Sequence, residues 1–103
     1  MKLTVMVTIL ALAASGSALA DAAAGKAVYT ANCAKCHGDD GAGKAVIAKM
    51  LGATMKPLGS AEVKAKSDAV LAKDITQGSG KMKPVKLTDP QTKDVIAYIR
   101  TLK

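Results

Sequence analysis

The sequence predicts a small all-α domain, and three observations support this. Near the C-terminus, apolar side chains recur at helical intervals, at Val95, Tyr98, Ile99 and Leu102. Thr88 and Gln91 precede this stretch with the spacing of a helix capping box. No segment after residue 20 shows the alternation of branched or aromatic residues with polar ones that is typical of a strand.

The first helix is expected over residues 22–33, where alanine predominates and Asp21 can cap the N-terminus. Gly25 lies inside this helix, although a glycine there costs about 1 kcal/mol of helix stability relative to Ala. Such a glycine suggests that another helix crosses closely at this point. A shorter helix is expected over residues 44–51, with its apolar side chains directed inward: Val46, Ile47, Met50 and Leu51.

The second half of the chain carries clear helix boundaries. Ser67 is a favourable N-cap for a helix that runs to Gly78, and glycine is common just after helix C-termini. Asp89 and Pro90 occupy the first turn of the last helix, where a carboxylate and a proline are both favoured. The chain is therefore expected to fold into three to four short helices.

One short stretch carries the strongest chemical signal, namely Cys33-Ala34-Lys35-Cys36-His37. Two cysteines three positions apart, with a histidine directly after the second, form the C-x-x-C-H pattern by which haem is attached to a polypeptide. One turn of chain between the thiols matches the separation of the two porphyrin vinyl groups to which they add. His37 then offers the iron a neutral imidazole nitrogen.

Other uses of the cysteine pair are disfavoured. A structural zinc ion needs four ligands, and the chain has two cysteines and one histidine in total. A thioredoxin-like redox pair belongs to a βαβ setting that the sequence does not show. A disulfide across so short a loop would add little stability. These comparisons favour one covalently attached haem c.

Residues 1–20 have the pattern of a secretory signal peptide. A basic start at Lys2 precedes an uncharged apolar run over residues 3–14, and Ala18-Leu19-Ala20 forms an A-x-A cleavage pattern. The apolar run is shorter than the ~20 residues needed to span a bilayer. We therefore expect cleavage after Ala20, export to a bacterial periplasm and no stable membrane anchor.

The remaining residues, 21–103, are expected to form one small domain of 83 residues. Its composition suggests that a cofactor fills its centre. It contains no Trp or Phe, and Tyr29 and Tyr98 are its only aromatic residues. A haem is large, flat and mostly apolar, so a chain folded around it needs fewer bulky side chains of its own.

The chain is basic, with a formal net charge of +7 that becomes +6 when Lys2 is removed with residues 1–20. Its lysines are dispersed and not interleaved with aromatic residues, which disfavours nucleic acid as a partner. An acidic protein partner fits this charge better. Lysines flank the motifs expected to surround the haem, and we expect them to form a positive docking rim: Lys35, Lys44, Lys49, Lys56, Lys81, Lys83 and Lys86.

Haem iron in an electron carrier usually has a second protein ligand, and His37 is the only histidine of the chain. The methionines that follow the expected signal peptide are Met50, Met55 and Met82. Met82 is favoured, because its loop is rich in glycine, is limited by Pro84 and can fold back over the haem face opposite the histidine. Met55 also lies in a loop before a proline and remains the competitor. Met50 has helical spacing and is expected in the core.

Taken together, the motifs resemble those of the small class I monohaem cytochromes c of bacteria. The resemblance covers residues 21–103 and rests on four features: Cys33-x-x-Cys36-His37, Gly38-Asp39-Asp40-Gly41, Gly78-x-Gly80-x-Met82 with Pro84, and the final helix through Arg100. It implies an all-α cytochrome c fold wrapped around one covalent haem, in which the first and last helices cross nearly at right angles. By that likeness, Gly25 and Tyr98 mark the crossing and Tyr29 packs beside it.

Two features depart from the family pattern. Members often have proline directly after the ligand methionine, whereas Lys83 intervenes here before Pro84. Many also carry a Pro-x-Leu element whose proline carbonyl accepts the second N–H of the axial histidine. The nearest match is Pro57-Leu58, which is one residue shorter, so the sequence does not assign an acceptor to His37.

The expected function is that of a soluble, monomeric carrier that moves single electrons between larger periplasmic redox proteins. Cys33 and Cys36 are expected to hold the haem, and His37 and Met82 to ligate its iron. Because no bond in a substrate changes, we do not expect an enzyme. The alternative is a haem c ligand-binding or sensor protein in which Met82 leaves the iron easily.

Overall fold

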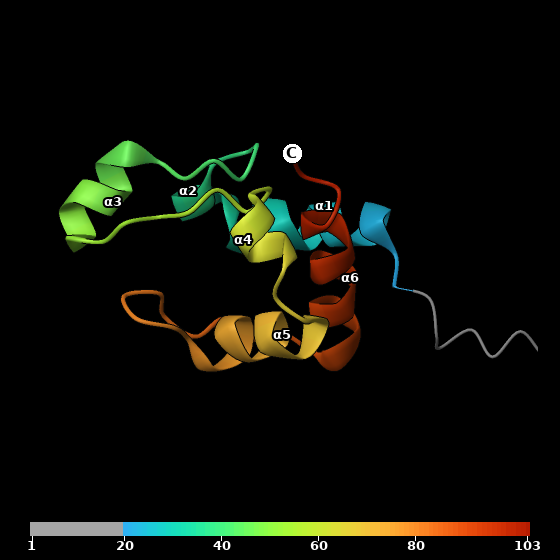
Figure 1. Cartoon of the computed structure of the whole chain (residues 1–103). Coiled ribbons are helices and arrows are strands. Elements are labelled where there is room, and N and C mark those ends of the chain that lie inside the picture. The colour runs from blue at the N-terminus through green and yellow to red at the C-terminus, as the bar shows by residue number, and fades with distance from the viewer. Residues whose placement is uncertain (1–19) are drawn as a thin grey trace, which may run out of the picture.

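The computed structural model describes residues 20–103, so the expected signal peptide, apart from its last residue, lies outside the described part of the chain. Within that part the chain forms six helices (Figure 1). Four correspond to the helices that the sequence predicts, and two are single turns. Their bounds are α1 Ala22–Asn32, α2 Ala34–His37, α3 Ala45–Leu51, α4 Ala61–Lys64, α5 Asp68–Gln77 and α6 Asp89–Ile99.

The crossing of α1 and α6 is the centre of the fold (Figure 1). Gly25 is buried where the α6 backbone passes, and a Cβ at this position would lie 1.9 Å from the carbonyl oxygen of Asp94. Glycine is therefore required for this approach. Beside it, the ring centroids of Tyr29 and Tyr98 are 5.2 Å apart with the rings tilted by 56°. The close crossing that the sequence predicts at Gly25 and Tyr98 is confirmed.

The longer helices begin at the predicted caps. The Asp21 carboxylate accepts two backbone N–H groups from the first turn of α1, and the Ser67 hydroxyl accepts one from the first turn of α5. Thr88 and Gln91 form both halves of the capping box of α6. The sequence does not predict α2 and α4, because a helix of four residues leaves no periodic pattern.

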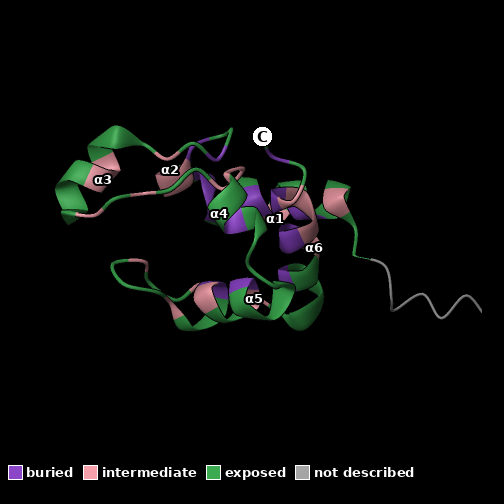
Figure 2. Ribbon diagram, in the orientation of Figure 1, coloured by how far each residue is buried: buried purple, intermediate pink, exposed green. Residues whose placement is uncertain are grey.

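Buried residues lie on the parts of α1, α5 and α6 that meet (Figure 2). Tyr29 and Val95 are the most deeply buried, at 1% and 0% exposure. The other buried hydrophobic residues are Cys33, Ala34, Val63, Leu71, Ile75, Ile96, Ile99 and Leu102. The predicted inner face of the last helix is confirmed at Val95 and Ile99, while Tyr98 is half-buried and Ile96 also joins the core. Leu102 is buried as predicted, but it lies beyond the end of α6.

The predicted inward orientation of α3 is wrong. None of its seven residues is buried, and Val46, Met50 and Leu51 are 69%, 75% and 39% exposed. Only Ile47 and Ala48 are half-buried, so Met50 is not a core residue. Helical spacing shows which residues share a face, but it does not show whether another element covers that face. Here α3 stands apart from the crossed α1–α6 pair (Figure 1).

Arg100, directly after α6, holds the segment between α4 and α5. Its Nη2 atom donates to the Lys66 carbonyl oxygen at 2.6 Å and to Asp68 Oδ1 at 2.8 Å. Its Nη1 atom donates to the Lys64 carbonyl oxygen at 3.2 Å. In Figure 1, α6 runs between an upper layer with α1, α2 and α3 and a lower layer with α5. The Arg100 contacts fix the chain where it passes from one layer to the other.

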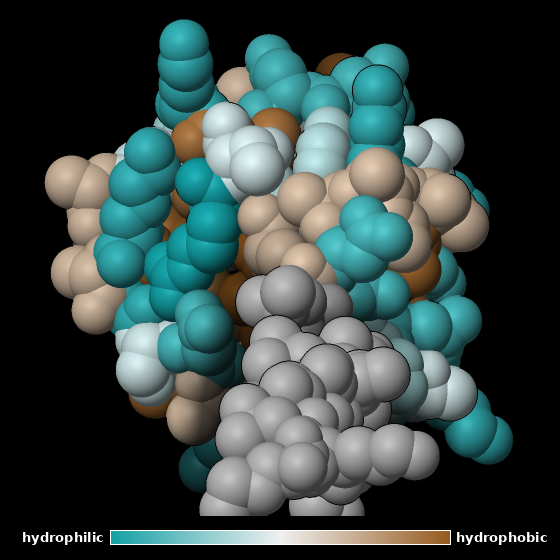
Figure 3. Space-filling view, turned by 90° about the vertical axis from the view of Figure 1, so that its right-hand side faces the viewer, coloured by the Kyte–Doolittle hydropathy of each residue, from teal (hydrophilic) through white to brown (hydrophobic). Residues whose placement is uncertain are grey.

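The end of the molecule opposite α3 carries many hydrophilic side chains, with the most hydrophobic residues recessed between them (Figure 3). Among residues 20–103, every helix falls short of the length and hydrophobicity that a membrane-spanning helix requires. These residues also form no strand, and their extended pairing is limited to a single bridge between Ser79 and Met82.

Candidate haem attachment site

Cys33, Cys36 and His37 lie on one helical turn that continues α1 after a bend. The N–H of Cys33 donates to the Tyr29 carbonyl oxygen at 2.7 Å as the last bond of α1. The Cys33 carbonyl oxygen then accepts the N–H groups of Cys36 and His37 at 3.2 and 3.0 Å. A single turn thus carries two thiols and an imidazole, which is the arrangement that attachment to one porphyrin needs.

Both cysteines are free thiols, and they differ in exposure. Cys33 is 8% exposed, and Cys36 is half-buried. Burial, with a smaller effect of the neighbouring Cys36, raises the pKa of the Cys33 thiol to about 11. Cys33 is therefore protonated at neutral pH. This disfavours a dithiol redox pair, because such pairs react through a thiolate.

His37 ends α2 with a half-buried side chain. Burial lowers its pKa, so the ring is neutral at pH 7 and can offer a nitrogen lone pair to a metal. Its Nδ1 atom is buried and has no hydrogen-bond partner among the described residues. A neutral imidazole directly after two paired thiols has the donor set of a C-x-x-C-H haem site. The residues present therefore fit covalent haem attachment.

The glycine-rich loop over residues 38–43 folds back onto the end of α2. The N–H of Gly43 donates to the His37 carbonyl oxygen at 2.7 Å, and the N–H of Lys44 donates to the Cys36 carbonyl oxygen at 3.0 Å. These bonds satisfy carbonyl groups that the end of a helix leaves without intrahelical partners. The loop is thereby held against the backbone of the histidine.

Two long-range contacts that support this loop are absent from the sequence prediction. The Tyr29 hydroxyl donates to the Gly38 carbonyl oxygen at 2.6 Å from within the core. Gly41 is buried near the C-terminus, and a Cβ there would lie 2.7 Å from Leu102 Cδ1. The run of glycines predicts a turn, but no local pattern identifies the distant residues against which that turn packs.

Met82 lies in a tight turn after α5. Its backbone N–H and carbonyl oxygen pair with those of Ser79 at 2.9 and 3.1 Å. Gly78 permits the turn, because its φ is 84° and a Cβ there would lie 2.7 Å from the Met82 carbonyl oxygen. The N–H of Val85 donates to the Ile75 carbonyl oxygen at 2.8 Å and fixes the other end of the segment. The half-buried Met82 packs against the core.

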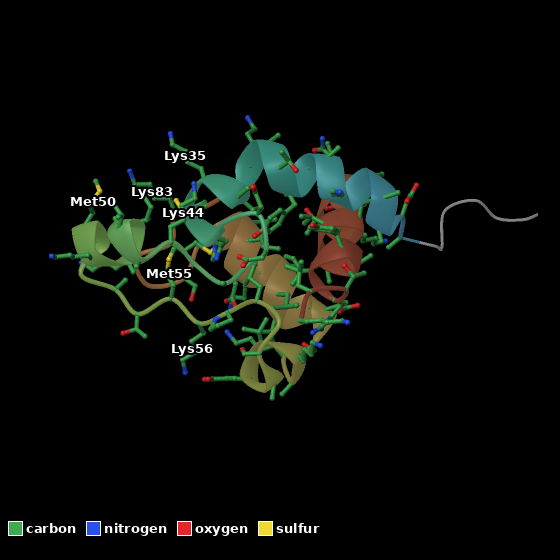
Figure 4. All side chains as sticks on the ribbon, turned by 90° about the horizontal axis from the view of Figure 1, so that it is seen from above. Lys35, Lys44, Met50, Met55, Lys56 and Lys83 are labelled. Carbon is green, nitrogen blue, oxygen red and sulfur yellow. The ribbon has the colours of Figure 1, made fainter. Side chains whose placement is uncertain are left out.

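Met82 and His37 belong to different layers at the same end of the molecule. Figure 1 shows α2 in the upper layer and the loop after α5, drawn in orange, in the lower layer. Met55 lies in the same layer as His37. A Cβ on Gly43 would lie 3.1 Å from Met55 Cβ, and the N–H of Gly43 is hydrogen-bonded to the His37 carbonyl oxygen. Met50 lies at the outer edge of the molecule (Figure 4).

The segment around Pro57 packs against the glycine-rich loop. The N–H of Leu58 donates to the Gly41 carbonyl oxygen at 2.9 Å. Gly59 passes so close to the C-terminus that a Cβ would lie 2.3 Å from the carbonyl carbon of Lys103. This segment therefore supports the loop, and it supplies no acceptor to His37 within the described residues.

The seven lysines expected to surround the haem are all exposed. Figure 4 shows Lys35, Lys44 and Lys83 on one side of the end that carries α2 and α3, and Lys56 on the other side. Lys56 forms an ion pair with Glu62, and the two side chains are 54% and 58% exposed. Within residues 20–103, no three His, Cys, Asp or Glu side chains gather in a way that could hold a metal ion.

Comparisons with known proteins identify the family of the chain. A family model described as cytochrome c matches residues 22–103. The chain is 38% identical over 89 residues to cytochrome c-554(547) of Halothiobacillus neapolitanus, across 81% of this chain and 98% of that protein. The fold matches a solved structure, the KustC0563 c-type cytochrome, with a TM-score of 0.65 and 31% identity, across 77% of this chain and 96% of that chain. The chain therefore belongs to the cytochrome c family, whose cofactor is covalently bound haem c.

Proposed function

We propose that this cytochrome c is an exported one-electron carrier that shuttles electrons between larger periplasmic redox proteins. The observation that carries the proposal is the single turn on which two thiols and a neutral imidazole come together, at Cys33, Cys36 and His37. Haem c, when bound there, supplies a ferric–ferrous couple that takes one electron from a donor and passes the same electron to an acceptor. No group is transferred, so we infer a carrier and not an enzyme.

Each of the proposed site residues has a separate task. Cys33 and Cys36 keep the haem attached as thioethers. The lowered pKa of His37 keeps its ring neutral and available as an axial ligand. The thioether of Met82, as the second axial ligand, would raise the reduction potential, because methionine–histidine ligation favours ferrous iron. The chain thus provides both the attachment and the ligands.

The placement of the chain supports Met82 over Met55 as the second ligand. A second axial ligand would be expected from a segment separate from the loop that is hydrogen-bonded to the His37 backbone. Met55 packs against Gly43, which is a residue of that loop. Met82 is presented by a separate turn that is attached to α5 in the other layer (Figure 1).

The exposed lysines support partners with acidic docking surfaces. Positive side chains attract such partners over distances of about 10 Å at moderate ionic strength, and salt weakens the attraction. Lys35, Lys44 and Lys83 all lie at the end of the molecule that carries α2 (Figure 4), with Lys83 on the loop after α5 in the other layer (Figure 1). In this proposal the cytochrome acts as a monomer and does not engage nucleic acid.

Near-infrared absorption of the oxidised holoprotein tests the ligand set, because methionine–iron(III) ligation gives a weak band in that region. We expect the band in the wild type and in Met55→Ala. We expect Met82→Ala to lack the band and to have a lower reduction potential. If Met55→Ala abolished the band instead, the ligand would be Met55. If the wild type lacked the band and its reduced form bound carbon monoxide, the ligand-binding alternative would replace the carrier.

A second experiment tests the attachment. His37→Ala is expected to prevent stable haem incorporation, measured as the haem content of protein exported by cells that mature c-type cytochromes. Lys35→Ala, in the same turn but exposed, is the matched control and should retain haem. A fully loaded His37→Ala protein with an unchanged spectrum would contradict the proposed site.

A further inference from the structure

α3 exposes an apolar surface that the core does not use. Four large hydrophobic side chains are exposed within residues 20–103, and three of them lie on this seven-residue helix. Val46 and Met50 are 69% and 75% exposed, and Leu51 is 39% exposed. We call these three residues the α3 apolar surface. A gathered apolar patch of this kind marks an interaction site more often than scattered apolar residues do.

The geometry of the helix keeps this surface turned away from the body of the protein. Val46 and Met50 are four residues apart, so they lie on the same face of α3. The half-buried residues of the helix are Ile47 and Ala48. Met50 lies at the outer edge of the molecule in Figure 4, beyond the labelled Met55.

Positive charge surrounds the α3 apolar surface. Residues 44–51, which form α3 and its N-cap, contain two lysines and no Asp or Glu. Lys44 is the N-cap residue of α3 and Lys49 lies in its last turn, whereas Lys56, in the returning loop, is paired with Glu62. All three side chains are exposed. The surface is therefore apolar at its centre and basic at its edge.

This charge selects the kind of partner. A second copy of the chain would bring like-charged lysines together around the patch, on a domain whose net charge is already +6 without residues 1–20. An anionic membrane would gain little, because membrane binding scales with buried apolar area and three side chains on two turns offer a small area. A protein with an apolar patch bordered by carboxylates matches both the centre and the edge.

We propose that the α3 apolar surface, with Lys44 and Lys49 beside it, is the contact by which this cytochrome docks an acidic redox protein. This inference rests on the proposed carrier function and names the surface that its partner uses. The lysines attract the partner and orient it, and burial of Val46 and Met50 then stabilises the encounter complex.

The test measures electron transfer from the reduced holoprotein to an oxidised acidic blue copper protein by stopped-flow absorption. The ferrous haem loses one electron, and Cu(II) gains it to become Cu(I). The double variant Val46→Ser, Met50→Gln removes the centre of the surface. Val70→Ser is the matched control, because Val70 is a 45% exposed hydrophobic residue on α5. We expect the second-order rate constant to fall about fivefold or more in the double variant and to stay unchanged in the control.

Two variants that each remove one positive charge test the basic edge of the α3 apolar surface. Lys49→Gln should reduce both the rate constant at low ionic strength and its dependence on salt. Lys93→Gln, an exposed lysine on α6 with the same charge change, should reduce neither as much. Equal effects of the two substitutions would show that only the net charge matters, and the docking surface would then be refuted.

Oxidation by ferricyanide separates failure of this inference from failure of the proposed function. If the wild type cannot pass electrons to ferricyanide, the carrier function itself is wrong. If every variant reacts normally with ferricyanide and the double variant also reacts normally with the copper protein, only the docking surface is refuted. A changed visible haem spectrum in the double variant would refute it too, because α3 would then cover the haem.

Two further measurements test whether the α3 apolar surface binds lipid or a second copy of the chain instead. Phosphatidylglycerol vesicles that bind the wild type but not the double variant, with no change in the copper reaction, would assign the surface to lipid and overturn the proposal. Sedimentation that shows a wild-type dimer and a monomeric double variant would assign it to a second copy, with the same consequence. A monomer that does not bind vesicles, combined with the rate losses above, supports docking.

Discussion

The Tyr29 hydroxyl donates a 2.6 Å hydrogen bond to the carbonyl oxygen of Gly38, the residue directly after the C-x-x-C-H motif. Tyr29 is 1% exposed and packs in the α1–α6 crossing, so the bond joins the core to the exit of the haem attachment turn. Gly38 has a φ of 80°, which leaves its carbonyl in an orientation that an L-residue with a side chain rarely adopts. A side chain of the crossing thus stabilises the backbone next to His37.

Tyr29→Phe is expected to lower the free energy of unfolding of the holoprotein by about 1–3 kcal/mol, because the buried Gly38 carbonyl loses its donor. For a domain of this size that corresponds to a fall in Tm of at least about 4 °C. Thermal unfolding followed by circular dichroism measures it. Tyr98→Phe is the control, since no residue within 20–103 accepts a hydrogen bond from that hydroxyl. Equal losses in the two variants would show that the Tyr29 bond contributes nothing specific.

Ionisation of the Tyr29 phenol is expected to lower the free energy of unfolding at alkaline pH. Burial, and to a smaller extent charges at Cys33, Tyr98, Asp40 and Asp39, together raise the pKa of Tyr29 to about 12. In the unfolded chain the pKa is near 10. The unfolded state therefore releases this proton first as the pH rises, and the folded state loses stability from about pH 10 to about pH 12.

Denaturant unfolding of the wild type and of Tyr29→Phe across this pH range isolates the contribution, because the lysines titrate in both proteins. We expect the wild type to lose more stability than the variant as the pH rises. In the holoprotein Cys33 is a thioether and carries no charge, so burial remains as the main cause. A constant difference between the two proteins from pH 9 to about 12 would contradict the assignment.

The sequence predicted those parts of the fold that local chemistry determines. Caps at Asp21, Ser67 and Thr88 mark the starts of α1, α5 and α6, because side-chain oxygens there bond to the next few N–H groups. The haem motif is equally local, since two thiols and an imidazole need only one turn of chain. Gly25 was also informative, because a glycine inside a helix implies a close neighbour.

Long-range packing could not be predicted in the same way. The apolar residues of α3 share helical spacing with those of α6, yet only α6 has a partner helix against its face. A Cβ on Gly59 would lie 2.3 Å from the carbonyl carbon of Lys103, yet no local sequence pattern at Gly59 indicates that the C-terminus passes there. The bond from Tyr29 to Gly38 depends on how the chain folds back after the motif. Such contacts follow from the tertiary fold and not from periodicity.

Gly25→Ala is expected to destabilise the holoprotein by about 3 kcal/mol, at the upper end of the usual range for overpacking. The new methyl group would lie 1.9 Å from the Asp94 carbonyl oxygen and 2.4 Å from its carbon, and these backbone atoms can move only if the helices separate. Chemical denaturation of the purified holoprotein measures the loss. Gly52→Ala is the control: its φ of 61° carries strain, but nothing lies within 4 Å of the added carbon. A smaller loss at Gly25 than at Gly52 would mean that the crossing tolerates a side chain.

Asp94 offers a test of how removal of the expected signal peptide affects the fold. Its Oδ1 atom accepts the backbone N–H of Asp21 at 2.8 Å. Cleavage after Ala20 would convert that N–H into an ammonium group, which the positive end of the α1 dipole disfavours and the Asp94 carboxylate favours. Processing would therefore replace a hydrogen bond between α1 and α6 with an ion pair at the start of the domain.

Asp94→Asn is expected to destabilise a chain that begins at Asp21 by roughly 0.5–1 kcal/mol, the usual range for an ion pair near the surface. The side-chain oxygen remains in Asn, and the Asp94 backbone against Gly25 is unaffected, so the loss reports the charge. In a chain that begins at Ala20 the ammonium group lies one residue further from Asp94, and the same substitution should cost less. The loss of stability caused by Asp94→Asn should differ less between the two chains when the salt concentration is raised. Equal losses in both, independent of salt, would show that Asp94 acts only as a neutral acceptor.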